Sequence, residues 1–384
     1  MQNVIINQTN DETSVYILEN NKLCEMYCYR KDIESTLGNI YNGKVTDIVN
    51  GMQAAFINLG LERNAFISVK DALKKVDVAK EEQDTNLKMS DVLKVGQNVL
   101  VQVKKEPTDG KGARVSTHIT LPGKYIVLMP GTDILTVSQK IEDEAERERL
   151  KQIISRVLPG EFGAIIRTDA INASEEALTS DVASLFDSWN DILEKASQSD
   201  DVGILYDDHD IVERTIRDAI NQNTQKVYVN SEVVYSRVCS ALGDERCILD
   251  KDADLVSKFG LEAEIARVQN RKVYLNCGGH IVIDKTEALT AIDVNSGKYT
   301  GSKDLESTTL KVNLEAATEI MRQIRLKDIG GIVVVDFIDM HTEENKNKII
   351  ELMRKEAKKD RSKVDVRDFT QLNLVELTRK KMYV

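Results

Sequence analysis

The chain has 384 residues, 41% hydrophobic and 30% charged, which is typical of a folded protein and excludes a largely disordered one. Its length predicts several domains, and no run approaches the ~18 apolar residues of a membrane-spanning helix, so no integral membrane segment is expected. A net charge of −11 argues against nonspecific adhesion to a polyanion, so any nucleic-acid site must be local.

The cysteines and histidines are the side chains that would report disulfides or zinc. The five cysteines are scattered and odd in number, which argues against a disulfide framework and fits a reducing compartment. The four histidines have no zinc-binding spacing, so zinc is not expected. The N-terminus lacks the features of a secretory signal, and the expected location is the cytoplasm.

The N-terminal third reads as β structure. The first thirty residues alternate apolar and polar side chains around the turn residues Asn20 and Asn21, which predicts a hairpin. Short strand patterns separated by glycines then continue to residue 122, as in a small barrel of the OB type. The strands expected in this barrel cover residues 40–49, 53–59, 64–69, 98–104 and 113–119.

The middle of the chain changes to a mixed α/β pattern. Strands are expected at 125–129 and 163–166, with helices at 141–158 and 174–196. Further on, a helix at 211–221 is followed by strand patterns at 226–229 and 272–275. Both of these strands are expected to complete the sheet begun by the N-terminal hairpin.

The last third has the clearest pattern. A strand at 288–292, a long helix at 305–326 and a strand at 332–335 predict a parallel pair joined by a right-handed crossover. A further strand at 281–283 precedes this unit, and a helix at 343–359 follows it.

Two aspartates follow the strands of this crossover. Parallel pairing would bring Asp293 and Asp336 to one sheet edge, where open α/β sheets bind ligands. Residues 332–335 are all apolar and indicate a strand buried on both faces, so an acid there needs a partner charge or a metal. Magnesium takes one or two carboxylates together with substrate phosphate oxygens. Asn295 would face the same side as Asp293, and Asp339 would lie just outside the pair.

This spacing alone leaves a structural role open, because acids also end strands as caps and turn residues. Basic residues cluster at 104–114, 355–363 and 379–381. Each cluster by itself is typical of a solvated surface, whereas several together could line a track for a nucleic-acid backbone.

Three long motifs resemble the bacterial ribonuclease E/G family. They are residues 287–296 (EALTAIDVNS), 313–317 (NLEAA) and 330–340 (GGIVVVDFIDM), and the likeness extends into the barrel at 38–45 and 54–57. The resemblance implies an α+β and α/β multidomain fold in four parts. These are an RNase-H-like platform (1–36 and 211–278), an OB-fold RNA-binding domain of S1 type (37–122), a 5′-sensor (123–210) and a DNase-I-like catalytic domain (279–384).

The resemblance also implies an activity. It is that of a magnesium-dependent endoribonuclease, with manganese as a substitute ion. The substrate is single-stranded, A/U-rich RNA, cut to leave a 5′-phosphate and a 3′-hydroxyl in RNA processing and mRNA decay, with a preference for 5′-monophosphorylated RNA. Asp293 and Asp336 would hold the metal and Asn295 would assist. RNA contacts would come from Phe56, Phe66 and Lys111, and the 5′-phosphate pocket from Gly123, Val127, Arg167 and Thr168.

Simpler interpretations exist for these residues. The phenylalanines could belong to the barrel core, Lys111 could be an ordinary hairpin lysine, and Arg167 could be a surface residue at a strand end. Two departures from the family are visible. Gln139 stands where the family commonly has arginine, so sensing is expected to weaken or to use Lys140. The family's Cys-Pro-x-Cys zinc link is absent from this chain, so a homodimer or higher oligomer would form without it.

Two other functions stay open at this point. One is a noncatalytic RNA-binding protein that works through the barrel and uses the acids for structure. The other is a DNA nuclease, which rests only on analogy with the fold expected for residues 279–384. Chelation separates the first from the leading hypothesis, since only a metal-dependent nuclease would stop cutting in excess EDTA.

Overall fold

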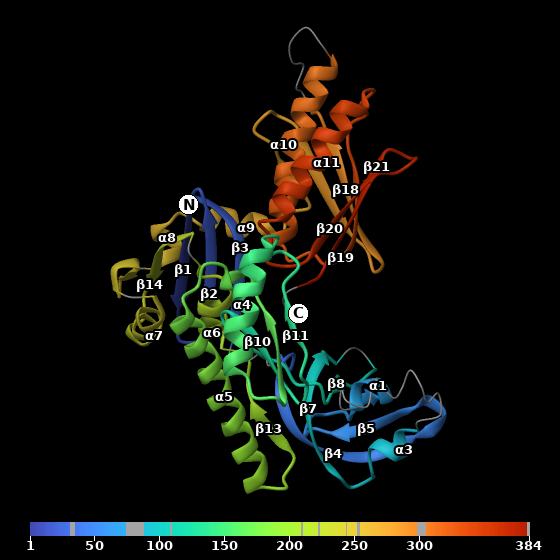
Figure 1. Ribbon diagram of the computed structural model, residues 1–384. Coiled ribbons are helices and arrows are strands. Elements are labelled where there is room, and N and C mark those ends of the chain that lie inside the picture. Colours follow the sequence, from blue (N-terminus) through green and yellow to red (C-terminus); the bar gives the residue numbers. More distant parts are fainter. Residues whose placement is uncertain are drawn as a thin grey trace. The chain divides into compact units, whose positions relative to one another are not determined.

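The computed structural model describes residues 1–30, 35–73, 88–107, 110–208, 210–221, 223–242, 244–251, 254–297 and 305–381. The chain forms two compact units, coloured along the sequence in Figure 1. Residues Met1–Asp32 and Gln222–Val384 make the first unit, and Ile33–Asn221 make the second. The second unit is therefore an insertion into the first.

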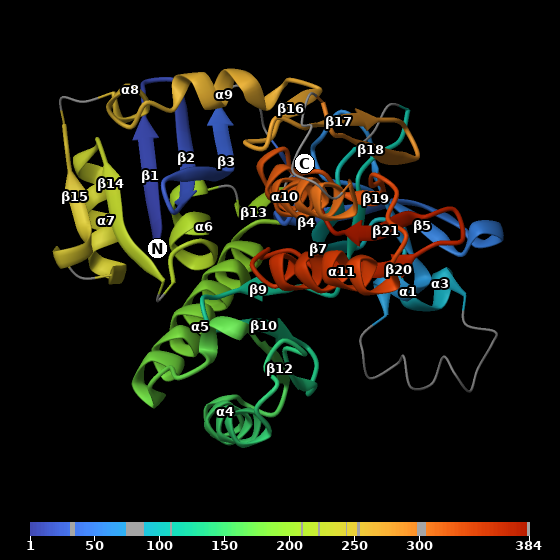
Figure 2. The ribbon, with the colours of Figure 1, turned by 90° about the horizontal axis from the view of Figure 1, so that it is seen from above.

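The N-terminal segment forms a meander of β1 (Gln2–Gln8), β2 (Glu12–Glu19) and β3 (Lys22–Arg30). Asn20 and Asn21 have φ of 50° and 62°, as a tight turn between β2 and β3 requires, so the predicted hairpin is confirmed. β14 (Thr224–Val229) adds to β1 in parallel, and β15 (Cys247–Leu249) adds to β14. Figure 2 shows these strands side by side.

The sequence predicts that strands at 226–229 and 272–275 both join this sheet, and only the first of them does. β14 joins as expected. β16 (Lys272–Tyr274) pairs instead with β17 (His280–Lys285) in the last sheet, so its predicted place was wrong. Helices α7 (Glu232–Leu242), α8 (Leu255–Lys258) and α9 (Glu262–Val268) lie between β14 and β16 in the chain.

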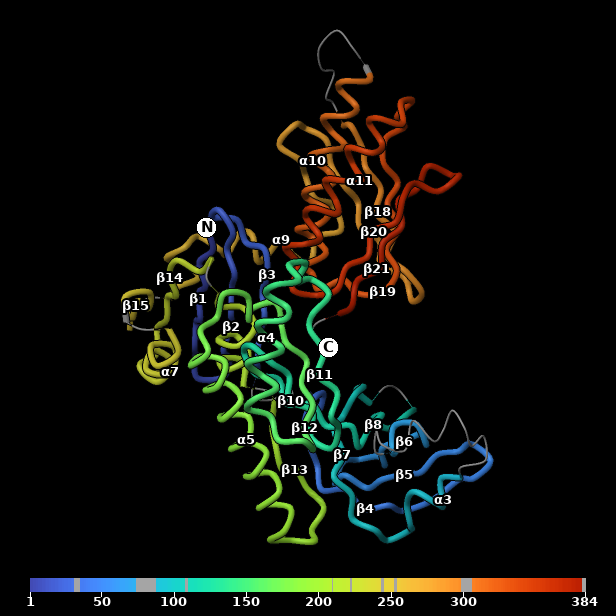
Figure 3. Tube along the Cα trace, viewed as in Figure 1, coloured from blue at the N-terminus to red at the C-terminus, as the bar shows by residue number. Residues whose placement is uncertain are grey.

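The inserted unit begins with the predicted barrel. Pairing of β4 with both β5 and β7 closes the strands, and alternate residues such as Ile57 and Ile67 fill the interior. The barrel strands, traced in Figure 3, are β4 (Ile40–Val49), β5 (Ala54–Asn58), β6 (Ala65–Ser68), β7 (Asn98–Lys105) and β8 (Arg114–Ser116). The short helices α1 (Val69–Ala72) and α3 (Met89–Val92) flank it, and β13 (Gly203–Tyr206) adds to the edge of β4.

The rest of the inserted unit is a small α/β layer. Its sheet has the order β11-β12-β10-β9, and helices α4 and α5 pack on it through Leu150, Ile154 and Leu178. Asp143 and Ser174 cap the two helices by accepting backbone N–H groups, which fixes where each begins. The elements are β9 (Leu121–Pro122), β10 (Ile126–Pro130), β11 (Leu135–Val137), α4 (Glu144–Val157), β12 (Phe162–Ile166), α5 (Glu175–Gln198) and α6 (Ile211–Asp218).

The last sheet has the order β16-β17-β18-β19-β21-β20. β18 and β19 run parallel and are joined through α10, so the predicted crossover pair is confirmed. Both helices pack on one side of the sheet, where Val312 and Ile349 meet Val333 and Val335 (Figure 1). The elements are β18 (Leu289–Asn295), α10 (Leu305–Leu326), β19 (Gly331–Asp336), α11 (Glu343–Ala357), β20 (Val364–Phe369) and β21 (Leu374–Arg379).

The prediction that residues 332–335 form a strand buried on both faces was wrong. Val333 and Val335 are fully buried, but Ile332 is 50% exposed and Val334 is only half-buried. Because α10 and α11 cover a single face, the other face of β18 and β19 is open. We refer to this uncovered side as the open face.

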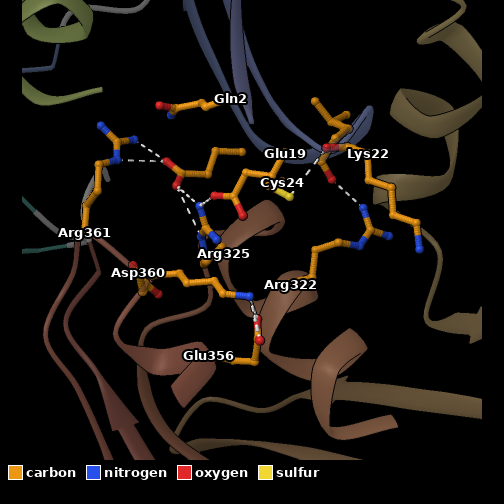
Figure 4. Close-up of polar contacts among 12 residues, drawn as sticks. Gln2, Glu19, Lys22, Cys24, Arg322, Arg325, Glu356, Asp360 and Arg361 are labelled. Carbon is orange, nitrogen blue, oxygen red and sulfur yellow. Dashed lines mark hydrogen bonds and ion pairs between the residues drawn. The ribbon is translucent and has the colours of Figure 1, made fainter. Parts of the chain in front are cut away.

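A buried ion cluster joins the N-terminal sheet to α10 within the first unit. Arg325 of α10 donates to Glu25 at 2.6 Å and to Glu19 at 2.5 Å, and Arg361 also bonds Glu25. Burial opposes ionisation of Glu25, but the guanidinium groups of Arg361 and Arg325 outweigh it and lower the pKa of Glu25 to about 2. Figure 4 shows Glu19, Arg325 and Arg361 of this cluster.

Several of the clustered basic residues are also committed to internal pairs. Arg379 is buried and bonds Asp360 and Asp328, each at 2.7 Å, while Arg114 bonds Asp71 at 2.7 Å. The predicted track of basic residues is therefore not formed by these arginines, which stabilise the fold. Among the helices that the structure describes, none is long and apolar enough to cross a membrane.

Candidate active site

The acid pair lies on the open face at the ends of β18 and β19. The parallel register aligns Asp293 with Asp336, on strands that run about 4.8 Å apart. Strand alternation turns Ile292 and Val294 into the core and leaves Asp293 exposed. Asp336 is exposed beside it. The structure thus brings the two predicted carboxylates together on one face.

Asn295 is the third member of this group. Its side-chain amide donates to Asp293 at 2.6 Å, Nδ2 to Oδ2. As predicted from alternation, it shares the open face with Asp293. This hydrogen bond fixes one carboxylate oxygen and leaves the rest of the pair accessible.

The electrostatic surroundings of the pair are acidic. Burial raises the pKa of Asp336, and the negative charges of Asp293 and Asp339 raise it further. Within the described part of the chain, the charged neighbours that shift this pKa are both acids. Such a group of carboxylates attracts a cation.

The donor set can be compared with what a metal requires. Within the described ranges, no group of three or more His, Cys, Asp or Glu side chains is arranged to hold a metal. Asp293 and Asp336 offer two carboxylates, which matches a magnesium ion that takes its remaining ligands from water and substrate phosphate. The residues fit a hard cation shared with a phosphate, and they do not form a closed cage of protein ligands.

Two neighbours on the open face were not predicted. Tyr274 pairs in register with His280, and His280 pairs with Asn295 on the next strand. Burial lowers the pKa of His280, Lys272 lowers it further, and Asp293 opposes the shift. The sequence did not reveal these residues because β16 was assigned to the N-terminal sheet. The alternation of apolar and polar residues on both sides of Gly278 and Gly279 could have predicted a hairpin of β16 with β17, and this would have placed Tyr274 and His280 near Asn295.

A second candidate site lies on the barrel. Phe56 and Phe66 are register partners on β5 and β6, with ring centroids 6.2 Å apart at 72°. Both are half-exposed, while their neighbours Ala55 and Ile67 are fully buried in the barrel core. Assigning these rings to the core is therefore wrong, and they form an aromatic pair on the outer surface.

Lys111 is exposed, and it precedes the residues that pair with Phe66 by two to three positions in the chain. Phe66 donates its backbone N–H to Ala113 at 2.7 Å and is the register partner of Arg114. A Cβ on Gly112 would lie 2.0 Å from the Asn64 carbonyl oxygen, so only glycine permits this close approach. The glycine holds the Lys111 segment against the strand that carries Phe66.

The residues matched to a 5′-phosphate pocket also converge. Arg167 donates to the Gly123 carbonyl at 2.6 Å and to Asp218 at 2.7 Å, so it is not a free surface residue. Thr168 Oγ1 lies 3.3 Å from Ser138 Oγ, next to the exposed Gln139. Val127 belongs to β10, next to Pro122 and Ile165 on the neighbouring strands.

Comparison with known proteins gives matches over almost the whole chain. The model of the ribonuclease E/G family matches residues 120–382, and that of the S1 RNA-binding domain matches 34–118. Ribonuclease G of Haemophilus influenzae is 36% identical over 388 residues, covering 98% of this chain and 79% of that protein. Ribonuclease G of Escherichia coli K12 gives the same identity and coverage. Ribonuclease E of a Nostoc species is 37% identical over 360 residues, covering 90% of this chain and 51% of that protein.

Proposed function

Because the chain belongs to the ribonuclease E/G family, we propose that it is an endoribonuclease that hydrolyses single-stranded RNA. The observation that carries this proposal is the register pairing of Asp293 with Asp336 on an open sheet face, with Asn295 bonded to one of them. Support also comes from the barrel, which matches an S1 RNA-binding domain and carries an outward aromatic pair.

Asp293 and Asp336 would hold magnesium, or manganese in its place. When bound, the ion supplies Lewis-acid stabilisation of charge on the phosphate. The two carboxylates provide the negative charge that retains it, and the hydrogen bond from Asn295 orients Asp293. Asn295 keeps a second amide hydrogen and a carbonyl oxygen with which to position the phosphate or the attacking water.

The proposed reaction is hydrolysis of a phosphodiester bond. The oxygen of a water molecule bonds to phosphorus, the bond from phosphorus to the 3′-oxygen breaks, and the leaving oxygen takes up a proton. The products are a 5′-phosphate on one fragment and a 3′-hydroxyl on the other. The substrates we infer are A/U-rich single strands in RNA processing, including rRNA maturation, and in mRNA decay.

The barrel would hold the RNA. Phe56 and Phe66 expose ring surface on which bases can stack, at about 1–3 kcal/mol per base. Lys111 is exposed between Gly110 and Gly112, and a lysine flanked by glycines can approach a phosphate closely. This arrangement is selective for unpaired bases, since a duplex does not offer its base faces.

The pocket around Arg167 would read a 5′-monophosphate. Its guanidinium is held in place by Gly123 and Asp218, and the Thr168 hydroxyl adds a second donor. Backbone groups of Gly123 and Val127 would complete the pocket. We expect Arg167→Ala to narrow the rate advantage of 5′-monophosphorylated RNA over its 5′-hydroxyl counterpart. If the unmodified chain cuts the 5′-monophosphorylated and the 5′-hydroxyl RNA at equal rates, it has no such preference. The replacement of the family's arginine by Gln139 would then account for the loss.

The finer architecture is part of the proposal. The parallel return of β14 to the N-terminal meander supports an RNase-H-like platform at residues 1–36 and 211–278, except that β16 within this range pairs in the last sheet. The two helices on one face of a mixed sheet support a DNase-I-like catalytic domain at 279–384. Residues 37–122 and 123–210 would be the OB-fold and the 5′-sensor. We further propose that the protein is cytoplasmic.

Replacement of each acid tests the proposal. Asp293→Asn or Asp336→Asn should lower the cleavage rate at least ~10³-fold, because the lost charge-stabilisation amounts to several kcal/mol. RNA affinity should change less than about twofold, since the barrel supplies most of it. Asp284→Asn is the matched control, because Asp284 lies on β17 in an ion pair with Arg271. Undiminished cleavage in either acid variant would refute the proposal.

A noncatalytic RNA-binding protein is the second candidate, favoured by the exposed aromatic pair of the barrel. It would bind single strands and leave them intact in magnesium. The same measurement decides between the two, because binding without fragments would support this candidate and reject the first.

A further inference from the structure

The open face carries an aromatic pair beyond the acids. Tyr274 on β16 and His280 on β17 are register partners, with ring centroids 6.2 Å apart at 50°. Tyr274 is 73% exposed, while Val273 beside it packs on the core. Tyr274 therefore contributes little to the folded core and presents most of its ring to solvent.

Strand pairing links this aromatic pair directly to the acids. His280 is the register partner of Asn295, which bonds Asp293 at 2.6 Å. A single row of side chains thus crosses three adjacent strands from Tyr274 through His280 to Asn295. Two strand spacings of about 4.8 Å separate the backbones of Tyr274 and Asn295 by roughly 10 Å. A nucleotide next to a phosphate held at the acids could reach this ring.

The charge on this side of the row suits a polyanion. Lys272 places its Nζ 5.1 Å from the centroid of the Tyr274 ring. The next row of the sheet runs from Lys272 through Val282 to Asp293. A cation and an exposed aromatic ring therefore stand together on one side of the acids, the combination used to track a single strand.

We propose that Tyr274 and His280 form a stacking subsite for the RNA base that adjoins the scissile phosphate, with Lys272 facing the backbone of that nucleotide. This subsite rests on the proposed endoribonuclease function. Tyr274 acts as a positioning residue, because its ring lies too far from the acids to take part in bond cleavage. Stacking accepts any base, so the subsite favours an unpaired nucleotide without selecting its identity.

The test uses steady-state cleavage of a short labelled single strand with one cut site. Tyr274→Ala should raise KM about tenfold and leave kcat within about twofold, since one base loses its stacking partner. Tyr274→Phe keeps the ring and should behave as the unmodified chain. Val233→Ala is the matched control, because Val233 is 68% exposed on α7, away from the open face.

A second substrate identifies the base. An RNA with an abasic site at the stacked position should raise KM for the unmodified chain by the same factor as Tyr274→Ala. It should add nothing in the Tyr274→Ala variant, because both changes remove one contact. His280→Ala should weaken the same position by a smaller factor.

Two results would overturn the subsite. One is an unaltered KM in Tyr274→Ala, and the other is full additivity of the variant with every abasic substitution. A change of oligomeric state in Tyr274→Ala, measured by sedimentation, together with additivity would assign the ring to a contact between copies of the chain. In each of these results the unmodified chain still cuts RNA. Failure of the proposed function looks different, since the unmodified chain would then cut nothing in magnesium.

Discussion

Two carboxylates in the same unit of the molecule have opposite surroundings. Glu25 is 3% exposed and lies between Arg325 and Arg361, which lower its pKa to about 2. Asp336 is largely exposed, and the partial burial of its carboxylate together with the charges of Asp293 and Asp339 raises its pKa. The chain thus supplies its own cations where an acid serves the fold. Among the described residues, the charged neighbours that shift the pKa of Asp336 are acids, which is the arrangement that our proposed metal site requires.

The difference is also one of energetic cost. Buried charge is tolerated only when it is paired, and Glu25 and Asp360 both meet arginines. Like charges on an open face destabilise the fold slightly, and this is a common feature of functional sites. Two kinds of substitution test this difference: removal of Glu25, the acid that is bound by arginines, and introduction of a cation next to Asp293 and Asp336.

Glu25→Ala should have the largest effect on stability. It leaves Arg325 and Arg361 without their buried carboxylate, which should cost about 3–5 kcal/mol in the free energy of unfolding measured with urea. Glu12→Ala is the control, because its partner Arg30 is exposed and solvent screens this pair, so the loss of stability should be much smaller. Equal losses in the two variants would contradict the assigned role of the cluster.

Acid pH should remove the same contribution gradually. The pKa of Glu25 lies at about 2 when folded, against 4.5 for the free side chain, so its stabilisation is complete above pH 4.5 and is lost as pH falls toward 2. The difference in unfolding free energy between the unmodified chain and Glu25→Gln should therefore shrink over this window. A difference that stays constant across it would show that Glu25 is not held ionised.

Ala291→Arg should give the open pair the cation that Glu25 already has. Ala291 is exposed on the same face, two residues before Asp293. An arginine there would compete with the metal and should lower cleavage on the order of 10- to 100-fold, a loss that excess magnesium partly reverses. Ala291→Gln adds a polar side chain without charge, and this variant should cut nearly normally. Comparable losses in both would point to steric obstruction.

Asp336→Asn should have the smallest effect on stability, and it should stabilise the fold, whereas Glu25→Ala destabilises it. The pKa of Asp336 is raised in the fold, so its ionised form costs stability as pH rises through that pKa. Without magnesium the variant should melt on the order of 1 °C higher at neutral pH. Added magnesium should stabilise the unmodified chain and not the variant. A lower melting temperature in Asp336→Asn would contradict the repulsion.

Local patterns predicted much of the fold. Period-two alternation gave the barrel strands, and the order strand, helix, strand gave the parallel pair that aligns Asp293 with Asp336. The helix predicted from residue 174 begins at Glu175, where Ser174 caps it. These features depend on residues close together in sequence.

The failures concern partners far away in sequence. β16 is three residues long, and nothing in its own pattern says which sheet it joins. Residues 332–335 are uniformly apolar, so they could not reveal that both helices lie on one face. Arg361 was read as part of a basic track, because its partner Glu25 lies 336 residues away. Tyr274 and His280 could not be predicted as neighbours of the acids, because the place of β16 in the last sheet could not be predicted.

Cleavage of a 5′-labelled single-stranded RNA by the full chain, with and without magnesium, tests the central claim most directly. The acid pair on the open face predicts internal fragments only when magnesium is present, with cutting abolished by EDTA and restored by excess magnesium. Asp336→Asn should give no fragments under any of these conditions. Fragments that persist in excess EDTA, or an intact RNA in magnesium, would contradict the claim that Asp293 and Asp336 are left open for a metal.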